Sequence, residues 1–173
     1  MKQAKKAAAL LRKKLENGVL AVEEFRGQST IVLNRDVIVE ACQILRDDSD
    51  LDFNILAALT AVDYWPEEPR FAVVYQLYSI ANNTFIGLRV PLRGTSPEVS
   101  TVETVYPNAN WREREVYDMF GISFTGHSDL RRILMPFNWE GHPLRKDYPL
   151  GEEEIQFSFN YDEIDRRKPY ARE

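Results

Sequence analysis

The sequence predicts an α+β fold in which helices pack on a mixed β-sheet. Segments whose apolar residues recur at helical spacing alternate with short runs of β-branched and aromatic residues, in the order helix, two strands, helix, three strands. Residues 71–80 (FAVVYQLYSI) are almost continuously apolar or aromatic, which is typical of a central strand covered on at least one face. We expect the sheet domain to span residues 1–94, followed by a short helical junction over 95–124 and an extended partner-binding arm and tail over 125–173.

A helix over residues 3–17 and a hairpin over 19–34 begin the predicted fold. The helix is followed by Gly18 at the position of a C-cap glycine, and its apolar positions are Ala4, Ala7, Ala8, Leu11 and Leu15. The hairpin consists of the runs VLAVEEF and STIVLN, separated by Arg26, Gly27 and Gln28. The outer face of the helix is basic. We interpret it as a solvated face, with contact to an anionic membrane surface as the alternative.

A second helix follows, capped by Asn34 or Asp36 and running to about Arg46. Its apolar stripe is formed by Val37, Ile38, Ala41, Ile44 and Leu45. Cys42 lies beside that stripe, and we interpret it as a buried structural thiol because no basic neighbour is apparent to lower its pKa. Three further strands are predicted over residues 58–64, 70–80 and 84–92, the last two joined by a turn at 81–83.

The junction is predicted to be helical. A short helical stretch is expected around residues 99–105, and a longer helix is expected to begin near Asn110. Asn110 with Glu113 three positions later resembles a capping box, and Gly121 closes the far end. On this helix the apolar stripe is formed by Val116, Met119 and Phe120. The opposite face places Arg114 four residues before Asp118 and Arg112 three before Glu115, so a lattice of ion pairs is expected there.

Composition and charge exclude several kinds of protein. The 173 residues carry a formal charge of −5, which argues against a protein whose main partner is nucleic acid. Cys42 is the single cysteine, so an intramolecular disulfide is impossible and an iron–sulfur cluster lacks its ligands in this chain. GxGxxG and GxxxxGK[ST] motifs do not occur. No apolar run is long enough to span a bilayer, and the basic N-terminus lacks the apolar core of a secretory signal.

Two histidines raise the alternative of an enzyme. His127 and His142 lie near Asp129, Glu140 and Asp147 in the sequence, which could form a carboxylate and histidine metal site. Their spacing does not match that of a zincin helix, and no GxSxG motif supports a serine hydrolase built on Ser123 or Ser128. A free-standing hydrolase therefore stays an alternative, as does a nucleic-acid binder that uses the N-terminal lysines.

The stretch from residue 127 to 150 is typical of a protein interface. It alternates arginines with prolines and large apolar side chains, among them Leu134, Phe137, Trp139 and Leu144, without a helical or strand period. Aromatic and arginine anchors are enriched where proteins meet, and prolines reduce the entropy lost on docking. The tail from residue 152 to 173 is acidic with interspersed aromatic residues, so we expect it to become ordered against a partner.

Three motifs occur in and just before this region: W-x-E-R-E-x-Y-D-x-F-G-I over residues 111–122, F-x-G-H-x-D-L-R-R-I-L over 124–134, and E-G-H-P-L-R-K-D-Y-P-L over 140–150. They resemble motifs of the 30-kilodalton subunit family of NADH–quinone oxidoreductase, the respiratory complex I, in which this subunit carries the letter C. The run Thr60-Ala61-Val62-Asp63-Tyr64 also fits the N-terminal α+β domain of that family.

The resemblance implies a subunit without catalytic, cofactor-binding or metal-binding residues of its own, within a proton-translocating oxidoreductase. Iron–sulfur clusters, FMN and quinone would be held by partner subunits. The chain would contact the subunit that forms the quinone pocket (lettered D) and the iron–sulfur subunits (lettered B and I). It would lie at the cytoplasmic face of the inner membrane in a prokaryote, associated with that membrane through the complex. Relatives also occur in ferredoxin-linked quinone reductases and membrane-bound hydrogenases.

The same resemblance assigns a set of residues to a structural junction or a partner interface. The junction residues are Glu113, Arg114, Glu115, Tyr117 and Asp118. The arm residues are His127, Asp129, Arg131, Arg132, His142, Arg145, Lys146, Asp147 and Tyr148. Whether each side chain braces this chain or touches a neighbour is left open by the motifs.

Overall fold

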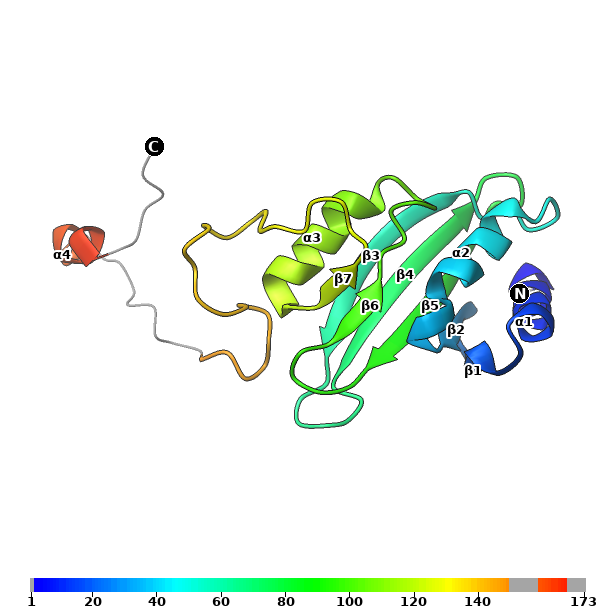
Figure 1. Ribbon diagram of the computed structural model, residues 1–173, viewed down its shortest axis with the longest axis horizontal. Coiled ribbons are helices and arrows are strands. Elements are labelled where there is room, and N and C mark those ends of the chain that lie inside the picture. Colours follow the sequence, from blue (N-terminus) through cyan, green and yellow to red (C-terminus); the bar gives the residue numbers. More distant parts are fainter. Residues whose placement is uncertain (1, 150–158, 168–173) are drawn as a thin grey trace.

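The computed structural model describes residues 2–149 and 159–167, so most of the acidic tail lies outside the described residues. It contains a five-stranded sheet in the order β1-β2-β5-β4-β3 and a separate pair, β6-β7 (Figure 1). Strands β2 and β5 pair parallel while the other neighbours in the large sheet are antiparallel, so the predicted α+β class with a mixed sheet is confirmed.

The element bounds follow the predicted order. The helices are α1 (Lys2–Lys14), α2 (Ile38–Asp47), α3 (Ala109–Phe120) and α4 (Tyr161–Arg167), with 3-10 turns η1 (Glu16–Gly18) and η2 (Arg35–Val37). The strands are β1 (Val19–Phe25), β2 (Gln28–Leu33), β3 (Ile55–Asp63), β4 (Phe71–Ser79), β5 (Thr84–Leu92), β6 (Glu98–Ser100) and β7 (Ser123–Thr125).

One face of the sheet forms the core together with α1, α2 and α3. Alternate strand residues such as Val73, Tyr75 and Leu88 are fully buried there against helix residues such as Leu11 and Leu45. Figure 1 shows α2 and α3 on the same side of the sheet. Because side chains alternate across a strand, the intervening residues point to the opposite face, on which no described helix packs.

The hairpin and the start of α2 are formed as predicted. Arg26 and Gly27 have φ values of 49° and 80°, which allow the tight turn between β1 and β2. Asn34 accepts a hydrogen bond from the backbone N–H of Asp36 at 3.4 Å and so begins the 3-10 turn that leads into α2. Cys42 is fully buried in α2, and burial raises its pKa well above the ordinary thiol value.

Three local predictions are wrong. The first helix ends at Lys14, before Gly18. A Cβ at Gly18 would lie 2.9 Å from Val37 Cγ2, so glycine is required there for close packing. The helix expected around residues 99–105 does not form. The segment begins within strand β6, which pairs parallel with β7, and then continues as turns. The expected capping box is absent from α3, since the Glu113 carboxylate binds a different segment.

Candidate interaction site: helix α3 and the arm

The segment from residue 126 to 149, called the arm below, follows β7 and folds back beside α3 (Figure 1). It contains no helix or strand in this described range. Its path is therefore held by side chains and isolated backbone hydrogen bonds.

Asp118, in the last turn of α3, binds the middle of the arm. Its Oδ2 atom accepts hydrogen bonds from three successive backbone N–H groups, those of Ile133 at 3.0 Å and of Leu134 and Met135 at 2.8 Å. Its Oδ1 atom accepts a bond from Arg132 Nη1 at 2.6 Å. Burial by itself would raise the pKa of Asp118, but these donors outweigh burial and the pKa is lowered. The carboxylate is thus held charged in a buried site.

The arm also caps the C-terminal end of α3, where helix carbonyls lack intrahelical partners. The Asp118 carbonyl lies 2.9 Å from His142 Nδ1, the Met119 carbonyl accepts the Leu144 N–H at 3.0 Å, and the Phe120 carbonyl accepts a bond from Arg145 Nε. Cationic groups at this end also complement the helix dipole. Burial lowers the pKa of both His142 and Arg145.

Gly121 ends α3 as predicted, in the left-handed conformation with φ 70°. A Cβ at this position would lie 2.5 Å from Arg145 Nη2 and equally close to the His142 ring. Glycine is therefore needed both for the backbone angle and for the approach of the capping side chains.

The ion-pair lattice predicted along α3 is wrong in its partners. Arg114 donates to the backbone carbonyls of Arg131 and Arg132, each at 3.1 Å, and lies over the ring of Trp111. Asp118 binds the arm as described above. Arg114 and Asp118 therefore bind backbone groups of the arm instead of each other. The arm has no helix or strand, so its backbone groups need such side-chain partners.

Glu113 and His127 each make buried contacts with other segments of the chain. The Glu113 carboxylate accepts bonds from the Thr101 hydroxyl and, at 2.8 Å, from the Val102 N–H, and burial raises its pKa. His127 Nδ1 accepts the Asp129 N–H at 3.0 Å and Nε2 lies 3.1 Å from the Asn110 carbonyl, an arrangement that fits the neutral Nε2–H tautomer.

The far end of the arm is anchored to the sheet by residues that sequence reasoning missed. Arg70 is only 2% exposed and pairs with Asp63 through two hydrogen bonds of 3.1 and 3.0 Å. Its Nη2 atom also binds Asp147 Oδ1 at 2.6 Å, and Asp63 accepts the Lys146 N–H at 2.9 Å. Asp63 ends β3 and Arg70 directly precedes β4. Opposite charges at the two ends of one connection are the sequence signal from which this ion pair could have been predicted.

The remaining predicted site residues lie at the periphery. Glu115 is exposed on α3, while the ring of Tyr117 meets the His142 ring edge-on with their centroids 6.2 Å apart. Arg131 is exposed and pairs with Asp129 at 2.8 Å. Tyr148 packs against Gly141, where a Cβ would lie 2.9 Å from its ring.

The arm exposes three large apolar side chains to solvent. Phe137 is 85% exposed, Leu134 62% and Leu144 54%. Leu134 belongs to the backbone run that Asp118 holds, so this apolar surface sits on a fixed frame.

The two histidines do not share a site. His127 lies against the Asn110 carbonyl at the first turn of α3, and His142 lies against the Asp118 carbonyl at its last turn. Over residues 2–149 and 159–167, no group of three or more histidine, cysteine or carboxylate side chains is arranged to hold a metal ion. Within the same ranges, no helix is both long and apolar enough to cross a bilayer.

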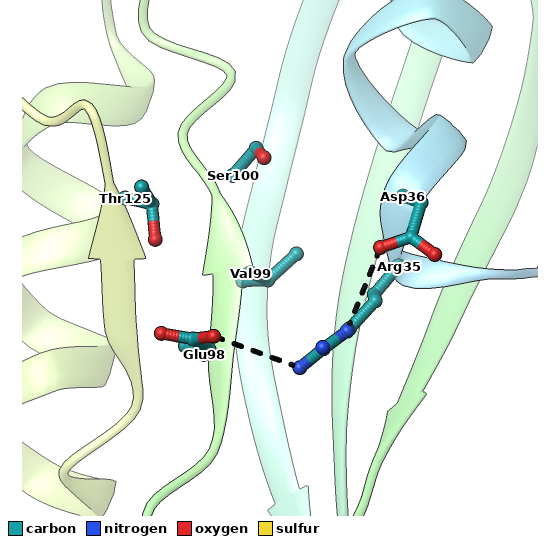
Figure 2. A pocket seen from close by; sticks show the side chains of 6 residues that line it. All are labelled: Arg35, Asp36, Glu98, Val99, Ser100 and Thr125. Carbon is teal, nitrogen blue, oxygen red and sulfur yellow. Dashed lines mark ion pairs between the residues drawn. The ribbon is translucent and has the colours of Figure 1, made fainter.

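A small polar hollow lies beside β6 and β7. It has a cavity volume of about 110 Å³ and is lined by Arg35, Asp36, Glu98, Val99, Ser100 and Thr125. Figure 2 shows the Arg35 guanidinium between the carboxylates of Asp36 and Glu98, at 3.6 and 3.9 Å. These are loose, solvent-exposed ion pairs, which contribute little to stability.

The fold and the site define an α+β sheet domain followed by an arm that is bound to helix α3. The family model described as respiratory-chain NADH dehydrogenase, 30 Kd subunit, matches residues 31–154. The NADH-quinone oxidoreductase subunit lettered C from Roseiflexus sp. (strain RS-1) is 50% identical over 163 residues, covering 94% of each chain. That of Geobacter metallireducens is 48% identical over 151 residues, covering 87% of this chain and 92% of the relative.

Solved structures agree with that match. The trypsin-resistant fragment (1-134) of Nqo5 is 33% identical, covers 71% of this chain and 98% of its own, and superposes with a TM-score of 0.61. A chain of the membrane-bound sulfane sulfur reductase, an archaeal respiratory membrane complex, is 21% identical with a TM-score of 0.72 over 100% of this chain and 97% of its own, which indicates a shared fold. The chain belongs to the family of the 30 Kd subunit of respiratory-chain NADH dehydrogenase. The resemblance seen in the sequence motifs is confirmed.

Proposed function

We propose that this chain is a structural subunit of a proton-translocating NADH–quinone oxidoreductase and takes no direct part in its chemistry. Its role is to hold partner subunits so that the distance from the last iron–sulfur cluster to the quinone stays fixed. In this proposal the iron–sulfur clusters, FMN and quinone are bound by partners, among them the quinone-pocket subunit and the iron–sulfur subunits lettered B and I. The chain lies peripherally at the cytoplasmic face of the membrane, attached through the complex.

The observation that carries this proposal is that charged side chains of the arm bind within the chain while its large apolar side chains are exposed. Three of its charged side chains, those of Arg132, Arg145 and Asp147, bind backbone carbonyls or buried partners within the chain. Phe137 and Leu134 remain exposed on the backbone that these contacts hold. A preformed apolar surface loses little conformational entropy when a partner covers it, which favours assembly. We accordingly propose residues 1–94 as the sheet domain, 95–124 as the junction and 125–173 as the partner-binding region.

This proposal assigns the predicted site residues to two roles. Arg114, Asp118, Arg132, His142, Arg145 and Asp147 brace the arm, as their contacts favour. Arg131, Lys146 and Glu115 are exposed, and we assign them to the partner-facing rim. Rim charges mainly affect orientation and association rate, whereas the buried apolar centre supplies most of the affinity.

The test is purification of the native complex from membranes in a mild detergent. We expect the chain to co-migrate with subunits that carry iron–sulfur clusters and the quinone pocket, and the assembly to oxidise NADH with a quinone acceptor. Migration of the chain by itself would contradict the proposal. An assembly that accepts electrons from ferredoxin or hydrogen, and not from NADH, would assign the chain to a related quinone reductase or hydrogenase instead.

Stoichiometric metal or hydrolytic turnover in the purified chain would favour the hydrolase alternative. Metal analysis of the isolated chain separates the two functions directly, because the structural role requires no bound metal.

A further inference from the structure

The face of the sheet opposite the helices carries mostly uncharged side chains, and no described helix covers it. Strand pairing places its residues in rows, such as Thr60–Val74–Arg89–Val32–Ala21 and Ala58–Gln76–Gly87–Thr30–Glu23. Within these two rows, Arg89 and Glu23 are the charged members, and they pair with each other. The rows also contain the apolar side chains of Val74, Val32, Ala21 and Ala58, whereas an antiparallel sheet normally carries polar side chains on a face that meets water.

A groove continues from this face around the end of the sheet. One part has a cavity volume of about 390 Å³ and is walled by the connection from Tyr64 to Pro69. A second part, of about 590 Å³, shares Pro69 and Pro91 with the first and extends past Leu20. Val32 and Ala72 lie along the first part, and although both are buried, neither belongs to the main core.

The two ends of the groove differ in charge. Arg35 and Arg93 line the second part, and Arg93 is exposed without an ion-pair partner among the described residues. In the part of the chain that the structure describes, Arg35 forms only the two loose ion pairs with Asp36 and Glu98 (Figure 2). Glu67 and Glu68 line the first part, where the backbone N–H groups of Arg70 and Gly94 already bind Glu68. The second part of the groove is therefore basic. The first part combines the apolar Val32 and Ala72 with Glu67, Glu68 and the paired Arg89 and Glu23, so it carries a net negative charge.

We propose that this uncovered face and groove form a second interface, which receives an apolar segment of a sister subunit whose carboxylates reach Arg35 and Arg93. Charge complementarity fixes the direction in which the segment lies. Small side chains in the first part of the groove, such as Ala21 and Ala72, allow its backbone to approach closely. The inference rests on the proposed function, because it requires that sister subunits are present.

The position of the groove supports a partner from the same assembly. The connection from Tyr64 to Arg70 separates the groove from the arm. On one side Arg70 binds Asp147 of the arm, and on the other Tyr64 and Pro69 wall the groove. A sister subunit bound to the arm is thereby next to the groove.

The test compares variants in the full chain, purified within the native complex. Thr60→Asp places a charge on this face at a position that carries none, and Arg93→Glu reverses the basic end. The matched controls are Thr104→Asp and Lys14→Glu, which are exposed sites that line neither part of the groove. We expect the first pair to lower the yield of chain recovered with the iron–sulfur subunits by about tenfold, since an unpaired buried charge weakens association. Unchanged thermal unfolding of the isolated variants would show that the loss is one of binding.

A photo-crosslinking residue at position 60 identifies the occupant. An adduct with a sister subunit supports the inference, whereas an adduct with lipid or with a second copy of this chain, or no adduct at all, overturns it. Wild-type recovery of Thr60→Asp and Arg93→Glu would also overturn it while leaving the proposed function intact. A wild-type chain that never co-purifies with sister subunits would instead reject the proposed function and this inference together.

Discussion

The Oδ1 atom of Asp118, in the last turn of α3, lies 2.6 Å from Nη1 of Arg132 in the arm. Arg132 Nη2 in turn donates to the carbonyls of Trp139 and Gly141, both at 2.9 Å. Asp118 also holds the backbone N–H groups of residues 133–135. The exposed Phe137 lies in the sequence between that run and Trp139, so its backbone is restrained from both sides.

Asp118→Ala is expected to destabilise the isolated chain by about 3 kcal/mol, because it leaves Arg132 and three backbone N–H groups without their acceptor. Urea unfolding measures the change. Asp129→Ala removes an exposed partner of Arg131 and should cost less than about 1 kcal/mol. Equal losses in the two variants would mean that Asp118 does not hold the arm.

Gly121→Ala is expected to destabilise the chain more than Gly94→Ala. Both glycines have positive φ, 70° and 80°, and both variants pay the cost of a left-handed alanine, about 1 kcal/mol. A Cβ at Gly94 meets nothing within 4 Å, whereas one at Gly121 collides with Arg145 and His142. Thermal unfolding should show an additional loss of about 1 kcal/mol or more for Gly121→Ala. No difference would contradict the described capping of α3.

Arg145→Ala and Asp147→Ala should reduce the amount of assembled complex before they alter its chemistry. Each removes an attachment of the arm, to the Phe120 carbonyl and to Arg70 respectively. Complex yield and quinone reductase activity per assembled complex are measured separately, with Glu140→Ala at an exposed arm position as the control. Normal yield with lost activity would point to a catalytic role and against a structural one.

The pH dependence of stability should contain two opposing contributions. The lowered pKa of Asp118 means that its stabilising contribution is complete above the unfolded value, about 3.9, and is lost as pH falls through the lower folded pKa. Burial raises the pKa of Glu113, so its ionisation opposes folding as pH rises from about 4.3 through the raised folded value.

Glu113→Gln should therefore lose the second slope in urea unfolding free energies measured across pH. Glu115→Gln, at an exposed position on the same helix, should retain it. If the two variants show the same pH profile, Glu113 is not the group responsible.

Cys42 should resist thiol reagents in the folded chain. The thiol is fully buried and burial raises its pKa, so both access and thiolate are lacking. Labelling followed by mass spectrometry should be slow in buffer and complete in urea. Rapid labelling of the folded chain would show that α2 opens readily.

The sequence could predict local features because their causes are local. The turn at Arg26 and Gly27, the strand over residues 84–92 and the glycine that ends α3 each depend on residues within a few positions. Strand β6 could not be predicted in this way, since it exists only through its pairing with β7, more than twenty residues later. The capping role expected for Glu113 is wrong for the same reason. Its carboxylate binds Thr101 and Val102, which only the fold brings close to it.

The sequence by itself determined the α+β class, the order of the elements, the family and the segment in which the interaction site lies. Periodicity, turn residues and motifs depend on neighbouring positions in the chain, so they can be recognised in the sequence alone. Only the tertiary structure decided that Asp118 binds the arm rather than Arg114, that Asp63 and Arg70 anchor Asp147, and that one face of the sheet stays uncovered. Those contacts join residues far apart in the chain, and a buried charge takes whichever donors the packed fold places within hydrogen-bond distance.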